Sequence, residues 1–526
     1  MTAPARAPRR AGTTAGHDRF AYLLHAEWTK FRTVRGWVIA LFVAAALPAV
    51  FALLNNGQCT VGTAACPAPP TGPGGEAVTD QFYFVHRPLA GNGSITVRVT
   101  SLTGRYHSNG GINPQNLTAG MTPGIQPWSK AGVIITASTK PGSAYAAMMV
   151  TGSHGVRMQW NYTADTAGMA GTTTAASPRW LRLVRHADTV TGYDSLDGTS
   201  WTRAGTVTLT GLPATAQAGV FATSPDHTRL ISQSAVGQSG AGGPSQATAT
   251  FDRIGLGGTW PARSWTGDAV GTDAAGSSAL NALDGYHGHG TGFTVTGTGD
   301  IAPAVPPAGG GTRIEEAISI GSFAALIAAA VLGALFITAE YRRGLIRLTL
   351  AVSGRRGRVL AAKAIVTGTV SLAAGLTGVA IALPVGLNKI RSGGNPIAPV
   401  PALTEVRVAA GAAALIAVAS VLALAVGAVL RRGAIAVTVV ITGIVLPYLL
   451  AITSLPTGAA DWLLRITPAA ALAIEQSVPA YPQVTAAYTP ADGYFPLAPW
   501  AGFAVLCAWT LAALVLAAVL QHRRDA

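Results

Sequence analysis

Charge is scarce in this chain. Only 11% of its 526 residues are formally charged, 36 basic and 22 acidic, against roughly 25% in an ordinary soluble domain. The mean hydropathy is +0.38, which excludes a wholly soluble enzyme and a disordered chain. Three cysteines are too few for a disulfide scaffold. We therefore expect a membrane protein that carries a large additional domain.

Six long apolar stretches contain no Asp, Glu, Lys or Arg at all. Crossing a bilayer takes about 20 mainly apolar residues, and one arginine at a helix centre costs about 2.5–3.5 kcal/mol on insertion. The stretches therefore predict six transmembrane helices, at residues 37–54, 317–339, 364–387, 408–430, 434–452 and 500–520. A cleaved signal peptide is the alternative for the first, short stretch. The 36 residues before it, and the lack of a clear small-x-small cleavage site, favour a retained anchor.

The basic residues follow the order of these spans. Residues 1–36, the loops after the second and fourth spans and the tail after the sixth together hold 18 basic and four acidic residues. All other segments hold 18 of each sign, so the whole net charge of +14 lies on one side. This positive-inside pattern predicts cytoplasmic termini in a multi-pass protein of the cell membrane. It also removes the need for a nucleic-acid partner.

The loop between the first two spans, residues 55–316, is nearly half the chain and is expected to be extracellular. Short β-type runs broken by turn residues predict an all-β sandwich or jelly roll over residues 80–254. Residues 255–316 are expected to be a Gly/Pro-rich return segment. Cys59 and Cys66 are predicted to form a small disulfide loop outside the membrane, and Cys507 to be a packing residue in the last span.

Catalytic and metal-binding patterns are weak in this loop. Its acidic residues form no recognisable pair of the kind that glycosidases require. Asp284 with His287 and His289 could form a metal cluster, but His-Gly-His in a Gly-rich loop is more often a solvated turn. We therefore expect neither a metal site nor catalysis here.

Two cytoplasmic elements suggest function. The first, residues 17–35, is predicted to be an amphipathic helix along the inner leaflet, with a solvated extension of the first span as the alternative. Its apolar stripe consists of Phe20, Leu23, Leu24, Trp28 and Phe31. The second element, residues 340–363, mixes apolar and basic residues. A short helix is expected over residues 345–352, broken by Ser353 and Gly354. Docking to a soluble partner would require such a helix, although positive-inside statistics alone could explain the arginines.

Part of the large loop resembles the concanavalin A-like lectin/glucanase superfamily. The motifs are WSKAGVII (128–135), PRWLRLVR (178–185), SLDGTSW (195–201) and AGVFA (218–222). Asp197-Gly198 looks like a tight hairpin turn, with Trp201 on the strand that follows. The resemblance implies a cell-wall glycan ligand with Trp201 as a candidate contact. The alternative is a structural sandwich whose tryptophans 128, 160, 180 and 201 are partly core, because a shared fold does not carry a site with it.

The membrane part resembles the permease subunits of type-2 ABC exporters. The motifs are AEWTKFRTVR (26–35), EYRRG (340–344) and RRGRVLAAK (355–363), in the right order around the first three spans. The resemblance implies that the first helix is a connecting helix and that residues 340–351 dock on an ATPase. It also implies short outer-face helices within residues 461–475. The implied coupling residues are Glu340, Tyr341, Arg342, Arg343, Gly344, Leu345 and Arg347.

No G-x-x-x-x-G-K-[ST] motif occurs in the chain, so nothing here can cradle nucleotide phosphates in the P-loop manner. The resemblance thus implies a non-catalytic permease without a cofactor of its own. Its expected partners are an ATP-binding ABC ATPase subunit, a second copy of itself and the lipid bilayer. Its expected cargo is an amphiphilic or envelope-related substrate moved outward. The alternatives are a membrane-anchored carbohydrate-binding receptor, which one span would suffice to tether, and a membrane-embedded enzyme, which would need ionisable groups within the spans.

Overall fold

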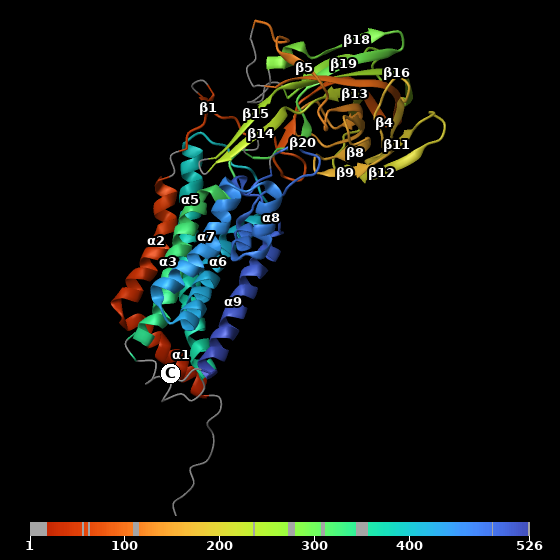
Figure 1. Cartoon of the computed structure of the whole chain (residues 1–526). Helices are drawn as coiled ribbons and strands as arrows, with labels where there is room; N and C mark the ends of the chain where they lie inside the picture. Colours follow the sequence, from red (N-terminus) through yellow and green to blue (C-terminus); the bar gives the residue numbers. More distant parts are fainter. Residues whose placement is uncertain are drawn as a thin grey trace, which may run out of the picture.

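The computed structural model consists of an elongated helical bundle with a β domain at one end (Figure 1). It describes residues 18–54, 57–61, 64–108, 115–234, 237–271, 279–306, 311–342, 344, 356–486 and 488–523.

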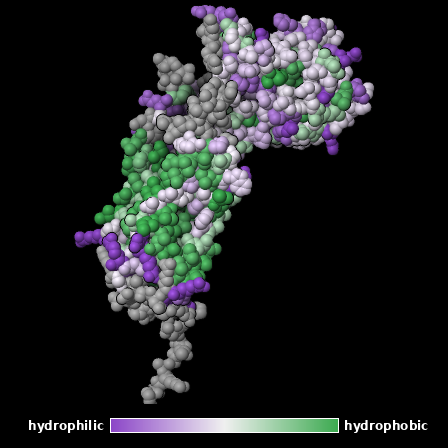
Figure 2. All heavy atoms as spheres, in the orientation of Figure 1, coloured by the Kyte–Doolittle hydropathy of each residue, from purple (hydrophilic) through white to green (hydrophobic). Residues whose placement is uncertain are grey.

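Six helices in the described part of the chain are long and apolar enough to cross a membrane. They are α2 (Arg35–Leu54), α3 (Ser319–Arg342), α5 (Arg356–Ser392), α6 (Ala402–Leu430), α7 (Gly433–Thr453) and α9 (Pro499–Arg523). The predicted six-helix membrane domain is confirmed, and Figure 2 shows apolar residues over much of the visible face of the bundle. Helix α5 is longer than expected, because its ends carry charges that an uncharged-run criterion leaves out.

Short helices lie at both ends of the bundle. Helix α1 (Asp18–Thr33) lies at the end opposite the β domain, close to where α9 ends (Figure 1). At the β-domain end lie α8 (Thr457–Ile466) and the 3₁₀ helices η2 (Ile314–Ala317), η3 (Pro468–Glu475) and η4 (Pro490–Asp492). Helix α8 and η3 occupy the place expected for the short outer-face helices.

Helix α6 lies at the centre of the bundle and packs closely on α3. Two thirds of its apolar window is buried (67%), against 17% in α2 and in α9, which are therefore peripheral. Small residues allow the α3 and α6 backbones to approach: a Cβ on Gly333 of α3 would collide with the carbonyl oxygen of Ser420 on α6. Close backbone approach replaces the hydrophobic effect as the source of helix association in lipid.

The β domain is built around one very long strand, β4. Fourteen of the described strands form a continuous sheet in which β4 pairs with β13, β10, β16, β17 and β5. The strands are β1 (Thr60–Val61), β2 (Ala64–Ala65), β3 (Val78–Asp80), β4 (Phe82–His107), β5 (Met121–Pro123), β6 (Lys130–Thr136), β7 (Tyr145–Thr151), β8 (Val156–Trp160), β9 (Ala164–Ala167), β10 (Arg179–His186), β11 (Thr189–Ser195), β12 (Thr202–Thr208), β13 (Thr215–Thr223), β14 (His227–Ser234), β15 (Gly237–Gly243), β16 (Ser245–Thr259), β17 (Thr266–Val270), β18 (Gly285–His289), β19 (Gly292–Thr298) and β20 (Ile301–Pro303).

Alternating side chains form the core of this sandwich. In β10, Leu181 and Leu183 are buried while their neighbours are partly exposed, as expected for strands with one inward face. Val220 of β13 lies opposite Val85 of β4 and Val133 of β6, and all three are fully buried. The all-β prediction is thus confirmed for the large loop.

The sandwich extends beyond the predicted boundary at residue 254. Strands β17 and β19 join the main sheet, and β20 pairs with β3 at the start of the domain. The Gly/Pro-rich composition suggested a return segment, but in β19 the side chains of Phe293 and Val295 point into the core. Residues 255–303 are therefore largely part of the folded domain.

Hydrogen bonds join the β domain and its leading loop to the bundle. Gln483 Nε2 donates to the carbonyl oxygens of Tyr162 (3.3 Å) and Thr163 (3.0 Å). Cys59 and Cys66 are disulfide-bonded, with Cα atoms 5.6 Å apart. Their backbone amides donate to Gly393 and Gly394 (2.9 and 3.1 Å), which directly follow α5. The disulfide loop therefore rests on the end of the longest helix.

We predict that Gly333→Val destabilises the bundle, because the new side chain must push α6 away from α3. Overpacking of this kind costs about 1–3 kcal/mol. Thermal unfolding of the purified protein in detergent measures the change. Gly443→Val on α7 is the matched control, since a Cβ there meets nothing within 4 Å. Equal melting temperatures for the two variants would contradict the packing.

Candidate functional site: a buried charge cluster at the end of the bundle

Four charged side chains from three helices meet at the end of the bundle opposite the β domain. We call them the charge cluster: Glu27 and Lys30 on α1, Glu340 near the end of α3 and Lys363 on α5. Lys363 Nζ lies 2.6 Å from Glu27 Oε2 and 2.7 Å from Glu340 Oε1. Lys30 Nζ lies 2.7 Å from Glu27 Oε1 and 3.3 Å from Glu340 Oε1. The two ammonium groups and two carboxylates balance in charge.

Three of the four side chains in the charge cluster are largely removed from solvent, whereas Lys30 is 41% exposed. The Lys363 side chain is fully buried, and the Glu27 side chain is 2% exposed. Removing an ion from water costs several kcal/mol, which only close pairing with good geometry offsets. Lys363 Nζ also lies 4.8 Å from the centroid of the Phe336 ring, within the range of a cation–π contact. Moving any one of the three helices alone would leave a buried charge uncompensated.

The charge cluster also sets which face of α1 meets the protein. Phe31 is 2% exposed and packs edge-on against Phe336, with ring centroids 5.7 Å apart. Leu24 packs on the same hydrophobic cluster. Trp28, in contrast, is 43% exposed. The predicted stripe therefore divides between bundle and surroundings, and does not lie wholly on a leaflet, because pairing of Glu27 with Lys363 turns one side of α1 inward.

The three motifs that suggested the permease resemblance converge here. Glu27 and Lys30 belong to AEWTKFRTVR, Glu340 to EYRRG and Lys363 to RRGRVLAAK. Glu27 and Lys30 are not members of the predicted apolar stripe, and no local pattern in the sequence connected them with Lys363. One feature of the sequence could have indicated the charge cluster: Glu27 and Glu340 are acidic residues within strongly basic segments.

The end of α3 is further tied to α9 and to the turn between α6 and α7. Gln521 Nε2 donates to the Tyr341 hydroxyl (3.1 Å), and Arg356 Nη1 donates to the Gln521 carbonyl oxygen. The Arg431 guanidinium lies 5.2 Å from the Tyr341 ring centroid. The expected coupling residues Glu340 and Tyr341 thus make intramolecular contacts, and Arg342 is exposed.

A basic cleft of about 1290 Å³ opens beside this end of α3. Its cationic lining consists of Arg342 together with Arg431 and Arg432 from the turn between α6 and α7. Gly344 also lines it and has a left-handed backbone, with φ of 68°. Arg343, Leu345, Arg347 and the helix expected over residues 345–352 lie outside the described residues.

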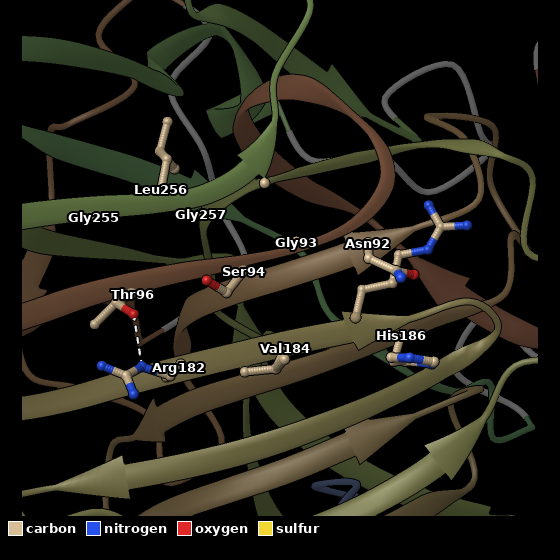
Figure 3. A pocket seen from close by; sticks show the side chains of 12 residues that line it. Asn92, Gly93, Ser94, Thr96, Arg182, Val184, His186, Gly255, Leu256 and Gly257 are labelled. Atoms are coloured by element: carbon tan, nitrogen blue, oxygen red, sulfur yellow. Dashed lines mark hydrogen bonds between the residues drawn. The ribbon is translucent and has the colours of Figure 1, made fainter.

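On the β domain, the candidate glycan contact Trp201 has one ring face covered. The Arg182 guanidinium lies 3.9 Å from the ring centroid, and Arg182 Nε donates to Thr96 Oγ1 (2.9 Å). Figure 3 shows Arg182 and Thr96 in a shallow pocket across β4, β10 and β16, which Trp201 does not line. A sugar could stack on this ring face only by displacing Arg182. Glycan binding by Trp201 stays a prediction.

The turn before Trp201 also differs from the expected tight hairpin. Strand β11 ends at Ser195 and β12 begins at Thr202, so Trp201 precedes the strand. Asp197 accepts hydrogen bonds from the amides of Thr199 and Ser200, both 2.7 Å. These bonds hold the pKa of the Asp197 carboxyl well below its usual range. The side chain thereby organises a longer loop than a two-residue turn.

The other tryptophans divide between the core and the surface. Trp128 is 6% exposed and stacks on His154, and Trp160 packs against the main core. The Arg98 guanidinium lies 5.8 Å from the Trp180 ring centroid.

The candidate metal residues do not come together. Asp284 accepts hydrogen bonds from Thr298 Oγ1 (2.8 Å) and Gln246 Nε2 (3.2 Å), and its burial raises its pKa to about 6. His287 and His289 are exposed on β18. Within the described ranges, no group of three or more His, Cys, Asp or Glu side chains is arranged to hold a metal ion.

The six apolar helices, with motifs from three segments meeting in one cluster, form a multi-pass membrane domain. A family model described as ABC-2 family transporter protein matches residues 144–526, and the chain belongs to this family. The match covers α3 to α9 and much of the β domain. Members of this family are transport subunits, so the permease interpretation is confirmed at that level.

Comparisons with individual proteins add little. No curated protein matches the chain. Among solved structures, a functionally unknown protein from Saccharomyces cerevisiae is 15% identical, with a TM-score of 0.22, over 38% of this chain and 85% of that one. The GH43 protein BlXynB from Bacillus licheniformis is 16% identical, with a TM-score of 0.16, over 25% of this chain and 24% of that one. Scytalido-glutamic peptidase is 9% identical, with a TM-score of 0.24, over 42% of this chain and 98% of that one. TM-scores this low carry no functional argument.

We predict that Lys363→Met strongly destabilises the protein, because Glu27 and Glu340 would remain buried with only Lys30 to balance them. Breaking a buried ion pair costs about 3–5 kcal/mol. Adding Glu27→Gln should recover part of the loss, since one charge of each sign then remains. Thermal unfolding in detergent checks both variants, with Lys389→Met near the other end of α5 as the control. A melting temperature for Lys363→Met equal to that of the control would contradict this role.

Proposed function

We propose that this chain is the permease subunit of an ABC exporter driven by a separate ATP-binding subunit. The observation that carries the proposal is the charge cluster. The family resemblance puts ATPase docking at residues 340–351, which begin at the end of α3 and precede α5 in the chain, and both helices are paired with α1 through Glu340 and Lys363. Displacement of that segment by an ATPase would therefore be transmitted to three helices together.

The proposal also gives an orientation. The start of α1 and the end of α9 lie at the same end of the bundle (Figure 1). The sequence segments that adjoin the helix ends on that side account for the net charge of +14, which favours the cytoplasmic side. The β domain would then lie outside the cell membrane, where a disulfide between Cys59 and Cys66 is chemically suited to the compartment.

The basic cleft supports the docking of a soluble partner at the same end. Among its described lining residues, Arg342, Arg431 and Arg432 would complement an acidic surface on such a partner. The chain has no phosphate-binding motif of its own, so ATP hydrolysis is assigned to the partner. We further infer a second copy of the chain as the other half of the pathway, and outward movement of an amphiphilic or envelope-related substrate.

We predict that reversing charge in the cleft uncouples the partner. Arg342→Glu, alone or with Arg343→Glu, should weaken ATPase binding and abolish stimulation of ATP hydrolysis by the permease, because the new carboxylates repel an acidic surface. Membrane insertion should be unchanged. Co-purification in mild detergent, with mass spectrometry of the bound proteins, and ATPase assays measure both effects.

Arg523→Glu, an exposed residue at the end of α9, is the control for charge reversal on the same side of the membrane. Equal ATPase binding and stimulation in the Arg342→Glu and Arg523→Glu variants would contradict docking at the cleft. Absence of any bound protein with a Walker A sequence, through several detergents, would overturn the proposed function itself.

A further inference from the structure

A second cavity lies at the opposite end of the bundle, beneath the β domain. Its volume is about 300 Å³, and it is enclosed by η2, α3, α6, α7, η3 and η4. The residues on which the argument depends are Arg313, Glu315, Phe323, Tyr448, Glu475 and Phe495. None belongs to the charge cluster.

Glu475 places a buried carboxylate in this cavity without a counter-ion. The residue is 8% exposed and lines the cavity. Within the part of the chain that the structure describes, no group donates a hydrogen bond to this carboxylate and no cation pairs with it. The neighbouring carboxylate of Glu315, 6% exposed, adds charge of the same sign. An isolated buried carboxylate is costly unless something neutralises it.

Two arginines close to Glu475 bind other groups. Arg407 donates from Nη1 to the Ile474 carbonyl oxygen (3.0 Å) and from Nη2 to that of Gln476 (2.6 Å). It thereby holds the backbone on both sides of Glu475. Arg313 Nε lies 3.1 Å from Glu316 Oε1 and 3.7 Å from Glu315 Oε1, while its buried Nη1 has no hydrogen-bond partner among the described residues. In the described part of the chain, neither guanidinium forms a hydrogen bond or an ion pair with Glu475.

Aromatic rings form another wall of the cavity. Phe323 and Tyr448 have ring centroids 6.0 Å apart, and Tyr448 and Phe495 stack at 6.4 Å with an interplanar angle of 25°. Ile320 and Leu472 add aliphatic surface. Aromatic faces attract cations, and the same surface accepts an alkyl chain. A carboxylate opposite an aromatic and aliphatic wall favours a ligand that is cationic at one end and apolar at the other.

We propose that this cavity binds an ammonium-bearing amphiphile, with its cationic head beside Glu475 and Glu315 and its apolar body against Phe323, Tyr448 and Phe495. The binding site is argued from the cavity alone. That its ligand is the exported substrate rests on the proposed function. The ammonium group could belong to a free alkylammonium compound or to a phosphatidylethanolamine headgroup, and the experiment separates these two sources.

The protonation of Glu475 gives the site a pH signature. Burial first, and the charge of Glu315 second, raise the pKa of Glu475 to about 8. A cation binds the ionised form, so its affinity should rise by up to about tenfold per pH unit toward pH 8 and then level off. The other titratable or charged groups facing this region are Arg313, Glu315, Glu316, Arg407, Tyr448, Asp492 and Tyr494.

The test uses the full chain in nanodiscs of phosphatidylglycerol, with dodecyltrimethylammonium as the probe and dodecanol as its uncharged counterpart. We expect Glu475→Gln to lower affinity for the cation about tenfold or more, as loss of a buried charge-assisted contact requires, and to remove the pH dependence. Dodecanol binding should change little. Glu405→Gln, at an exposed position near the start of α6, is the control.

Equal cation affinity in the Glu475→Gln variant and the native protein would overturn the proposal, as would an equal loss of dodecanol binding. Phosphatidylethanolamine added to the nanodiscs identifies the source: competition with the probe assigns the site to the lipid headgroup, and no competition assigns it to a free amphiphile. The assay needs no ATPase, so its result is separate from that of the Arg342→Glu experiment.

Discussion

The membrane domain depends on one buried ammonium group. The Lys363 side chain lies between Glu27 and Glu340 and is not exposed to solvent. These contacts join α5 to α3 and to α1, although Glu27 of α1 is 336 positions away from Lys363 in the sequence. Hydrophobic packing alone would let α1 turn or slide along an apolar surface, because such packing is non-directional. The ion pairs fix its rotation, which then determines that Phe31 packs on Phe336 and that Trp28 faces outward.

The two ends of the bundle treat buried charge differently. At the α1 end, carboxylates and ammonium groups neutralise each other, so the arrangement is complete without a ligand. At the β-domain end, the two arginines near Glu475 are held by backbone carbonyls or by other carboxylates, and Glu475 is left facing a cavity. The charge cluster therefore suits a rigid connection between helices. The cavity at Glu475 suits a site that binds and releases a cation.

Local sequence patterns predicted elements well and their partners poorly. Uncharged runs located all six spans, and alternation located most strands of the sandwich. Composition was misleading at residues 255–303, where a Gly/Pro-rich return segment was expected although Phe293 and Val295 of β19 pack inward. The apolar stripe of α1 was assigned to the leaflet because amphipathicity shows that a helix has an apolar face, but not whether lipid or protein covers it.

By itself, the sequence determined the membrane class, the number of spans, the asymmetry of charge and the absence of a nucleotide-binding motif. These properties depend on composition and on the spacing of nearby residues. The thickness of the bilayer and the free-energy cost of inserting a charge then determine which segments can span the membrane. Only the tertiary structure decided that Glu27 pairs with Lys363, 336 positions away, and that Glu475 has no hydrogen-bond or ion-pair partner among the described residues. Such contacts arise from how helices pack, and packing brings together residues that no local pattern connects.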